Sequence, residues 1–175
     1  YDDDLIDVSC DLKYFTLFKI ASRWFSLGEI IARQGLNGKR VASQINKLVF
    51  PWLEKHCQSP FFLFINYFDP HGPYLPPGKF SSLFRENEDR EITESERHRR
   101  QLLSQYDGEI AYLDYQIGKL IQRLKKLKIY DNTMIIITSD HGEFFGEHEG
   151  LWGHSHDLYE EVLKIPLIIK YPLSY

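Results

Sequence analysis

The chain of 175 residues is 43% hydrophobic and 15% aromatic, and it has a formal net charge of -4. This composition is typical of a globular domain with a core of its own and excludes a disordered chain. It also argues against nucleic acid as a partner, because no segment forms a dense Lys/Arg surface, and no apolar run is long enough to span a bilayer.

Helical patterns come first along the chain. Tyr14 to Ile31 is rich in aromatic residues at a roughly helical spacing, which favours a stripe packed on the core. Lys39 to His56 places its apolar residues on one face and predicts a further helix, which Pro51 is expected to kink or split.

A long helix is predicted from Thr93 onward. Thr93 and Glu96 have the form of a capping box, in which two side chains satisfy free backbone N–H groups at a helix start. Apolar residues then recur at steps of three and four as far as Leu127, and Gly108 and Gly118 are weak points in this pattern.

Three segments have the pattern of strands. Phe61 to Phe68 is short, aromatic and almost continuously apolar, which favours a strand buried on both faces. Met134 to Thr138 predicts the second strand and Pro166 to Tyr171 the third. Long helical segments between strands imply parallel pairing with right-handed crossovers. The predicted fold is therefore α/β, with a mostly parallel sheet flanked by helices, in a single domain over residues 1–175.

Polar residues follow the first two predicted strands. Asp69 and His71 come directly after the first strand, and Asp140 and His141 come after the second. Ligands of open α/β sheets bind beyond the carboxyl ends of the strands. Because parallel strands bring these ends to one edge, we expect both pairs of residues to face one crevice.

Asp140 and His141 are predicted to bind a metal ion. A carboxylate and an imidazole together suit Mn, Zn, Fe or Mg better than a purely oxygen-bound Ca. Gly142 lets the backbone turn sharply beside them. An isolated Asp-His-Gly is more often a turn in which Asp140 caps its own loop, but its place after a strand, with further acidic residues and histidines behind it, favours the metal site.

His71 and His154 are the candidate catalytic residues. His71 stands between Pro70 and Pro73, and a rigidly held imidazole can act as general acid or base near neutral pH. His154 and His156 lie close together further along the chain, and one of them is expected to bind an oxyanion or donate a proton, with His154 the stronger candidate. The alternative for each is a solvent-exposed loop histidine.

The other polar residues of these loops are expected to serve the structure. Glu143, Glu147, His148 and Glu149 are predicted to lie at the loop surface. Asp69 is predicted to stabilise its own turn rather than bind metal.

Four segments follow the order found in one known family. They are FFLFINYFDPHGPYLPP, YDGEIAYLDYQIGKLI, NTMIIITSDHGEFFGEH and LYEEVLKIPLIIKYP. Together they resemble the sulfatase family of the alkaline phosphatase superfamily. The TSDHGE piece is shared with other members of the superfamily, whereas the DPHGPY and LYEE…IPLII pieces are more particular to sulfatases. The resemblance covers most of the chain after Phe61 and implies an incomplete sulfatase-like fold.

The resemblance implies hydrolysis of the sulfate ester of a small molecule or glycan around one divalent cation, with calcium the usual metal of the family. It implies that Asp140 and His141 are metal ligands, that His71 protonates the leaving alcohol or holds the sulfate, and that His154 contacts a sulfate or leaving-group oxygen. Many sulfatases carry Asn in place of His141 and Lys near the position of His154, so Mn, Mg and Zn also stay open here.

The family's nucleophile is not found in the chain. Sulfatases use a formylglycine made from Cys or Ser in a C/S-x-P-x-R motif, and neither Cys10, followed by DLKYF, nor Cys57, followed by QSPFF, fits it. Paired aspartates at the end of a first strand are also not found, because the run Asp2 to Asp4 follows no strand. The chain is therefore expected to be an internal piece of a larger sulfatase and inactive alone. The pairing of the two cysteines stays open.

Two alternatives remain. One is a phosphomonoester or phosphodiester hydrolase of the same superfamily, which a Thr or Ser nucleophile upstream of Tyr1 would favour. The other is a scaffold piece without chemistry of its own. The sequence leaves open the substrate alcohol, the compartment and the oligomeric state.

Overall fold

The computed structural model describes residues 26–31, 41–85, 92–148, 150–154 and 158–173. Its elements in chain order are β1 (Ser26–Ile31), α3 (Ala42–His56), β2 (Phe61–Asn66), η1 (Gly78–Ser82), α4 (Glu94–Lys126), β3 (Ile135–Thr138), β4 (Phe144–Phe145), β5 (Trp152–Gly153), α5 (Glu160–Leu163) and β6 (Leu167–Lys170).

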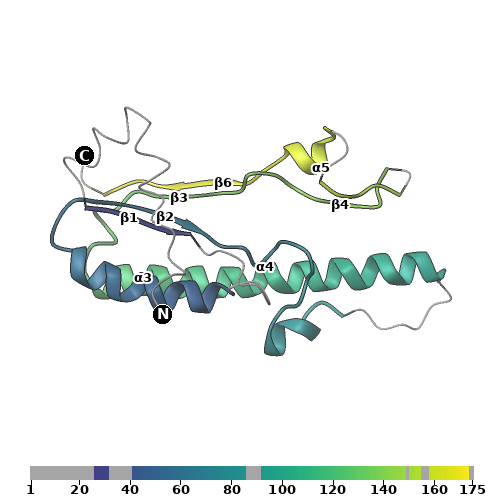
Figure 1. The fold of residues 1–175 in the computed structure, drawn as a ribbon, viewed down its shortest axis with the longest axis horizontal. Helices are drawn as coiled ribbons and strands as arrows, with labels where there is room; N and C mark the ends of the chain where they lie inside the picture. Colours follow the sequence, from purple (N-terminus) through teal and green to yellow (C-terminus); the bar gives the residue numbers. More distant parts are fainter. Residues whose placement is uncertain (1–25, 32–40, 86–91, 149, 155–157, 174–175) are drawn as a thin grey trace.

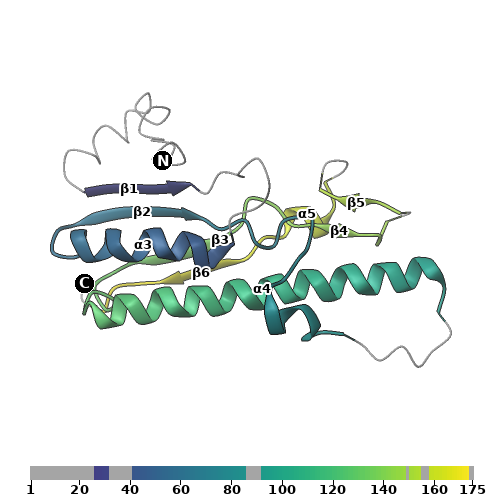
Figure 2. The same ribbon diagram turned by 60° about the horizontal axis from the view of Figure 1, so that its bottom comes forward.

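The described strands form three two-stranded ladders. β1 pairs in parallel with β2, whereas β3 pairs with β6, and β4 with β5, in antiparallel fashion. β2 and β3 run in the same direction in both views, and the segments that follow them head toward the same end of the molecule (Figures 1 and 2). The fold is α/β, but the expectation of a mostly parallel sheet is not confirmed.

The direction of β6 corrects the prediction for the third strand. β6 was expected to run parallel to β3, yet Ile135 pairs with Lys170 and Thr138 with Leu167 in an antiparallel register. A parallel return needs a long crossover connection, usually a helix. Among the described residues between the two strands there are only the β4–β5 hairpin and the four-residue helix α5, so the chain returns antiparallel.

Helices α3 and α4 cover one side of the strands (Figure 1). The core between the layers is formed by buried residues of both helices, with Phe61, Leu63 and Ile65 of β2 and Ile135 of β3 packed against them. The buried members of this core are Ile45, Val49, Leu53 and Leu124. The apolar faces of the two helices therefore pack against every second residue of β2 and against Ile135 of β3.

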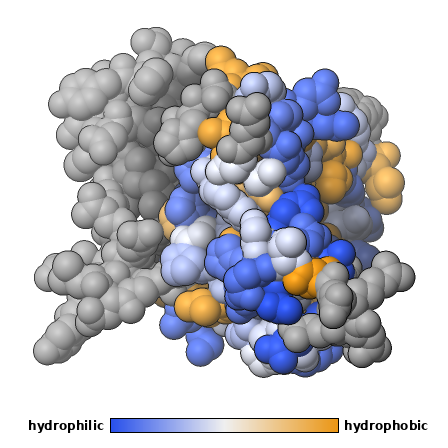
Figure 3. Space-filling model, turned by 90° about the vertical axis from the view of Figure 1, so that its right-hand side faces the viewer, coloured by the Kyte–Doolittle hydropathy of each residue, from blue (hydrophilic) through white to orange (hydrophobic). Residues whose placement is uncertain are grey.

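The opposite face of β2 is exposed, which corrects the expectation of a strand buried on both sides. Burial alternates along Phe61–Asn66, and Phe64 is 50% exposed. Ile136 of β3 and its partner Ile169 of β6 are exposed as well. The apolar run was interpreted as two-sided burial, but the described helices cover only one side. Seen from the α5–β4 end, the described surface is mostly hydrophilic, with apolar side chains in separate patches (Figure 3).

The first predicted helix is wrong where the structure describes it. Ser26–Ile31, the end of the aromatic-rich segment, forms β1 and pairs with Phe61–Asn66 residue by residue. Backbone pairing with a neighbouring strand therefore overrides the helical spacing. The rest of that segment, the Asp2–Asp4 run and Cys10 lie outside the described residues.

Both other helices form where they were predicted, but the split expected at Pro51 does not occur. α3 continues through Pro51 without a break, with the proline on its exposed side. α4 begins after Thr93, whose hydroxyl accepts a hydrogen bond from Glu96 N at 3.2 Å, and it runs unbroken through both internal glycines. Among the described residues, none of the helices combines the length and apolar character needed to cross a membrane.

Gly108 brings the segment that follows β2 close to α4. A Cβ at this position would lie 2.5 Å from the Phe80 carbonyl oxygen and 2.9 Å from Pro76 Cγ. The neighbouring Glu109 is buried, and its Oε1 accepts a hydrogen bond from Leu75 N at 2.7 Å. Glycine therefore permits the close approach, and the buried carboxylate then fixes the loop that carries His71.

Candidate active site

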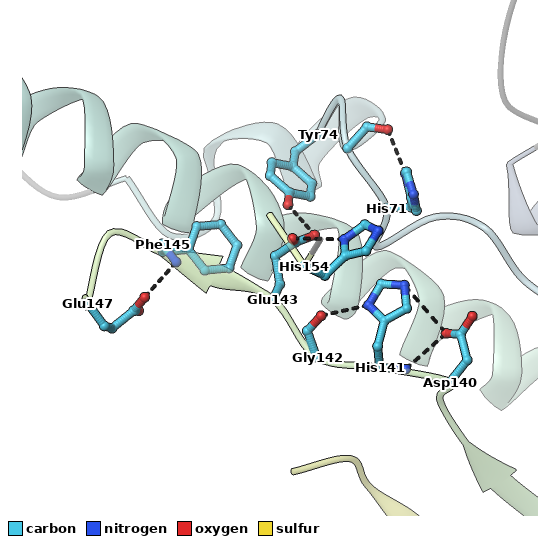
Figure 4. Close-up of polar contacts among 10 residues, drawn as sticks. His71, Tyr74, Asp140, His141, Gly142, Glu143, Phe145, Glu147 and His154 are labelled. Carbon is cyan, nitrogen blue, oxygen red and sulfur yellow. Dashed lines mark hydrogen bonds and ion pairs between the residues drawn. The ribbon is translucent and has the colours of Figure 1, made fainter. Parts of the chain in front are cut away.

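Three histidines from two loops lie together at the end of the strands. The ring centroid of His154 is 3.9 Å from that of His141 and 5.5 Å from that of His71. His71 comes from the loop after β2 and the other two come from the segment after β3, as Figure 4 shows. The expectation that these loops meet at one edge agrees with this geometry.

His71 is held by its own loop. Its backbone N–H donates to Phe68 O at 3.2 Å, and its ring stacks on that of Phe68 with centroids 4.5 Å apart. Its Nδ1 lies 2.8 Å from the carbonyl oxygen of Gly72. A carbonyl oxygen only accepts hydrogen bonds, so Nδ1 carries the proton and Nε2 keeps its lone pair.

His141 repeats this arrangement with the glycine that follows it. Its Nδ1 lies 2.7 Å from Gly142 O, so its Nε2 is also left with a lone pair. The Asp140 carboxylate accepts a hydrogen bond from His141 N at 3.1 Å, and its Oδ1 lies 3.8 Å from His141 Nε2. Asp140 therefore caps its own loop, as the alternative interpretation held, and also lies beside a ring nitrogen with a lone pair.

A hairpin returns His154 to the first part of its own segment. Phe144 pairs with Gly153 and Phe145 with Trp152, so the next step of this register places Glu143 opposite His154. Nδ1 of His154 lies 3.1 Å from Glu143 Oε1. An ionised carboxylate is only an acceptor, so Nδ1 of His154 carries the proton as well.

The segment of Glu143 is held on its other side by the chain before β6. Gly142 N donates to Val162 O at 2.7 Å, and Glu143 N donates to Glu161 O at 3.0 Å. A Cβ on Gly142 would fall deep inside the van der Waals radius of the Glu161 carbonyl oxygen. Glycine is therefore required beside His141 for close approach of two backbones.

The carboxylate of Glu143 has a further partner in Tyr74. The Tyr74 hydroxyl donates to Glu143 Oε2 at 3.0 Å, and the Glu143 side chain is only 8% exposed. Burial, and next the neighbouring Glu143 carboxylate, raise the pKa of Tyr74 well above its usual value, so the hydroxyl keeps the proton that it donates. The aromatic rings of Tyr106 and Phe145 pack around Tyr74.

Asp140 and His141 fit a metal ion as part of its ligand set. One carboxylate oxygen and one imidazole nitrogen with a lone pair lie 3.8 Å apart, a separation that one cation can bridge at ligand distances of about 2.0–2.4 Å. The Asp140 side chain is 91% exposed and free to adjust. Within the described part of the chain, no group of three or more His, Cys, Asp or Glu residues is arranged to hold a metal.

Comparison with known proteins identifies the family. The Sulfatase family model matches residues 14–175. The chain belongs to the sulfatase family.

Two curated sulfatases are similar to parts of the chain. N-acetylglucosamine-6-O-sulfatase of Bacteroides thetaiotaomicron is 42% identical over 72 residues, which cover 41% of this chain and 12% of that protein. Iduronate 2-sulfatase of Mus musculus is 28% identical over 154 residues, which cover 67% of this chain and 28% of that protein. The chain therefore spans less than a third of the length of either relative.

The fold is similar to solved structures as well. The crystal structure of a candidate sulfatase, yidJ of Bacteroides fragilis, matches with a TM-score of 0.62 and 27% identity, over 75% of this chain and 30% of that one. The described elements are thus part of a sulfatase-like α/β fold.

Two residues of this candidate site were not predicted from the sequence. Glu143 was expected at the loop surface, yet its side chain is nearly buried between Tyr74 and His154. Tyr74 belongs to the DPHGPY piece but was given no role in the site. A signal was available for Glu143, because glycines at 146, 150 and 153 indicate a tight hairpin that folds the segment after His141 back on itself.

The other acidic residues and histidines after His141 have other partners or lie outside the described residues. Glu147 Oε2 accepts from Phe145 N at 2.6 Å and therefore supports the hairpin. Nε2 of His148 lies 3.1 Å from Glu161 Oε2, and its ring stacks on Tyr159. Glu149, His156 and Asp157 lie outside the described residues.

Asp69 is buried and reaches another element. Its Oδ1 accepts a hydrogen bond from Ala42 N, at the start of α3, at 3.0 Å. The contact joins the turn before His71 to the first turn of α3. Asp69 was predicted to stabilise its own turn, and this contact extends its structural role to a helix 27 residues away in sequence.

Proposed function

We propose that the protein hydrolyses sulfate esters with the help of one divalent cation. The observation that carries this proposal is the convergence of His71, His141 and His154, each with Nδ1 bonded to an acceptor and Nε2 left with a lone pair. Membership of the sulfatase family supports the same reaction. Because the chain spans less than a third of its curated relatives, the activity is proposed for the whole protein.

Asp140 and His141 would hold the cation through a carboxylate oxygen and Nε2. A bound cation would act as a Lewis acid on the ester oxygens. We expect calcium, the usual metal of the family, whereas the imidazole donor of His141 keeps Mn, Mg and Zn as alternatives. Remaining ligands would come from other parts of the protein.

His71 is the proposed proton donor to the leaving alcohol. Its ring is held by Phe68 on one face, and Nδ1 is bonded to Gly72, so a proton on Nε2 is the one available for transfer. His154 is the proposed contact of a sulfate or leaving-group oxygen, because its ring lies between those of the other two histidines. This contact requires a proton on Nε2 of His154 as well as on Nδ1, because only then is Nε2 a donor, and a donor aimed at a developing negative charge stabilises the transition state.

The substrate is proposed to be a sulfated sugar or another small sulfate ester. Two of the similar proteins are named for sulfated sugar units, N-acetylglucosamine 6-sulfate and iduronate 2-sulfate. The described loops carry aromatic rings near the histidines, such as Phe68, and flat apolar rings are suited to pack against sugar faces.

Leaving-group dependence tests the role of His71. In the full encoded protein, His71→Ala should slow turnover of an alkyl or sugar sulfate by roughly 10²–10⁴-fold and that of an activated aryl sulfate much less, because only a poor leaving group needs the proton. His56→Ala is the matched control, because His56 is the last residue of α3 and its Nδ1 lies 2.8 Å from Trp52 O of the same helix. Equal slowing on both substrates would remove the proposed role.

Substrate comparison tests the reaction class. The full encoded protein should turn over an aryl sulfate faster than the matched aryl phosphate or phosphodiester. A preference for the phosphoester would establish the phosphatase-type alternative instead. The 175-residue chain alone should turn over neither ester, because it lacks the C/S-x-P-x-R motif of the sulfatase nucleophile.

A further inference from the structure

Among the described residues, Glu143 is the carboxylate that bonds to a ring nitrogen of one of the two proposed catalytic histidines, His71 and His154. It accepts from His154 Nδ1 at 3.1 Å and from the Tyr74 hydroxyl at 3.0 Å, one partner on each oxygen (Figure 4). Both oxygens are therefore engaged by donors from different loops. A side chain bonded at both oxygens has little rotational freedom.

The position of Glu143 is set by backbone on both sides. The β4–β5 register places it opposite His154, and its own N–H donates to Glu161 O at 3.0 Å. Its neighbour Gly142 donates to Val162 O. The carboxylate is therefore presented from a strand-like segment bonded along both edges, which is a rigid support for an imidazole.

We propose that Glu143 is a positioning residue for His154, with Tyr74 as its anchor. The carboxylate holds the proton of His154 on Nδ1 and thereby presents Nε2 to the space shared with His71 and His141. An imidazole that contacts a substrate through one nitrogen is commonly oriented by an acceptor on the other. This inference rests on the proposed function, because His154 contacts a substrate only if the site hydrolyses sulfate esters.

Comparison with His71 and His141 shows why the ring of His154 depends on a side-chain acceptor. His71 and His141 each bond their Nδ1 to the carbonyl oxygen of the next residue, a glycine in both cases. His154 is instead the residue after Gly153, and its Nδ1 bonds to a side chain across the hairpin. Of the three rings, His154 therefore depends on a side chain that can be replaced by mutation.

Kinetics of the full encoded protein test the proposal. Glu143→Ala should lower kcat by at least about 10-fold on a sulfate ester, and the isosteric Glu143→Gln should retain more activity, because its amide oxygen can still accept from Nδ1. Tyr74→Phe should lower kcat by about 2- to 10-fold, less than Glu143→Ala, because it removes one of the two donors that hold the carboxylate and leaves the bond to His154 in place. Glu161→Gln is the matched control, since it removes a carboxylate that lies 3.1 Å from another histidine, His148.

A double-mutant cycle separates positioning from a merely structural role. If Glu143 acts through His154, the double variant Glu143→Ala/His154→Ala should be no slower than His154→Ala alone, within about twofold. Losses that multiply would overturn the proposal, and so would Glu143→Ala with wild-type kcat. Melting temperatures of all variants show whether a loss reflects unfolding.

Imidazole ¹⁵N chemical shifts give a readout that does not need activity. In its neutral form, which the pattern of the two ¹⁵N shifts identifies, His154 should carry its proton on Nδ1 in the wild type and lose this preference in Glu143→Ala. An unchanged tautomer would overturn the positioning role. A wild-type protein without sulfate-ester turnover would instead count against the proposed function, and the tautomer would still decide this inference.

Discussion

The imidazole of His154 stacks on that of His141, with ring centroids 3.9 Å apart and an interplanar angle of 25°. The β4–β5 hairpin produces this contact, because its register carries His154 back beside the segment that begins at Asp140. The segment is held on its other edge by backbone bonds from Gly142 and Glu143 to the chain before β6. The site therefore depends on backbone packing as much as on its side chains.

Gly142→Ala should disrupt this packing. Its methyl group would overlap the Glu161 carbonyl oxygen, so two bonded backbones would have to separate. We expect a loss of about 2 kcal/mol or more in the free energy of unfolding, in the range of overpacked sites. Gly118→Ala is the control, because nothing lies within 4 Å of its Cβ position and alanine in a helix is favoured by about 0.5–1 kcal/mol. Urea unfolding of both variants measures the difference, and equal stabilities would contradict the prediction.

Asp69→Ala should destabilise the protein because it leaves Ala42 N at the start of α3 without this acceptor. The expected loss is about 1–3 kcal/mol, the usual result of removing a buried hydrogen-bond partner. Asp69→Asn should lose less, because an amide oxygen still accepts. Asp114→Ala, at an exposed position of α4, is the control and should change stability by less than about 0.5 kcal/mol. A urea midpoint for Asp69→Ala equal to that of the control would count against this role.

Stability should fall at alkaline pH through Tyr67. Burial, and next the charge of Asp69, raise the pKa of Tyr67 above its ordinary value of 10.0. Below pH 10 the folded and unfolded chains both hold the proton, so the stabilising effect is complete; above pH 10 the unfolded chain loses the proton first, and stability declines as pH rises.

Tyr67→Phe tests this pH dependence. The variant should show a shallower decline of the urea midpoint between about pH 9 and 11, since phenylalanine has no proton to lose. At neutral pH it should be less stable by about 1 kcal/mol, because the hydroxyl donates to the buried Asn46 at 2.6 Å. A residual decline is expected from Tyr74 and Tyr106, whose pKa values burial also raises. Parallel curves for the two proteins would refute the assignment to Tyr67.

The strand face that the described helices leave exposed should make the isolated 175-residue chain self-associate. Phe64 of β2, Ile136 of β3 and its partner Ile169 of β6 are all exposed, and exposed apolar patches of this kind mark interaction or aggregation sites. Light scattering after size exclusion should give a mass above that of one chain and one that rises with concentration. Phe64→Lys with Ile169→Lys should shift the chain toward a monomer. A monomeric wild-type chain at all concentrations would contradict the prediction.

The sequence by itself determined the features that depend on near neighbours. The apolar spacing of residues 103–127 and the Thr93 cap predicted α4, because both signals lie within a few residues of the helical turns that they stabilise. The short apolar runs predicted β2, β3 and β6. The polar residues that follow β2 and β3 predicted that His71 and His141 approach each other, because strand direction and sheet edge constrain such loops.

Only the tertiary structure decided what depends on contacts across the chain. The antiparallel direction of β6, the one-sided burial of β2 and the pairing of β1 each follow from which neighbour is present, and no local pattern contains that information. The same holds for Glu143. Its place between Tyr74 and His154 follows from a hairpin register and from a loop 69 residues earlier, so a residue typical of a solvated surface becomes a buried acceptor.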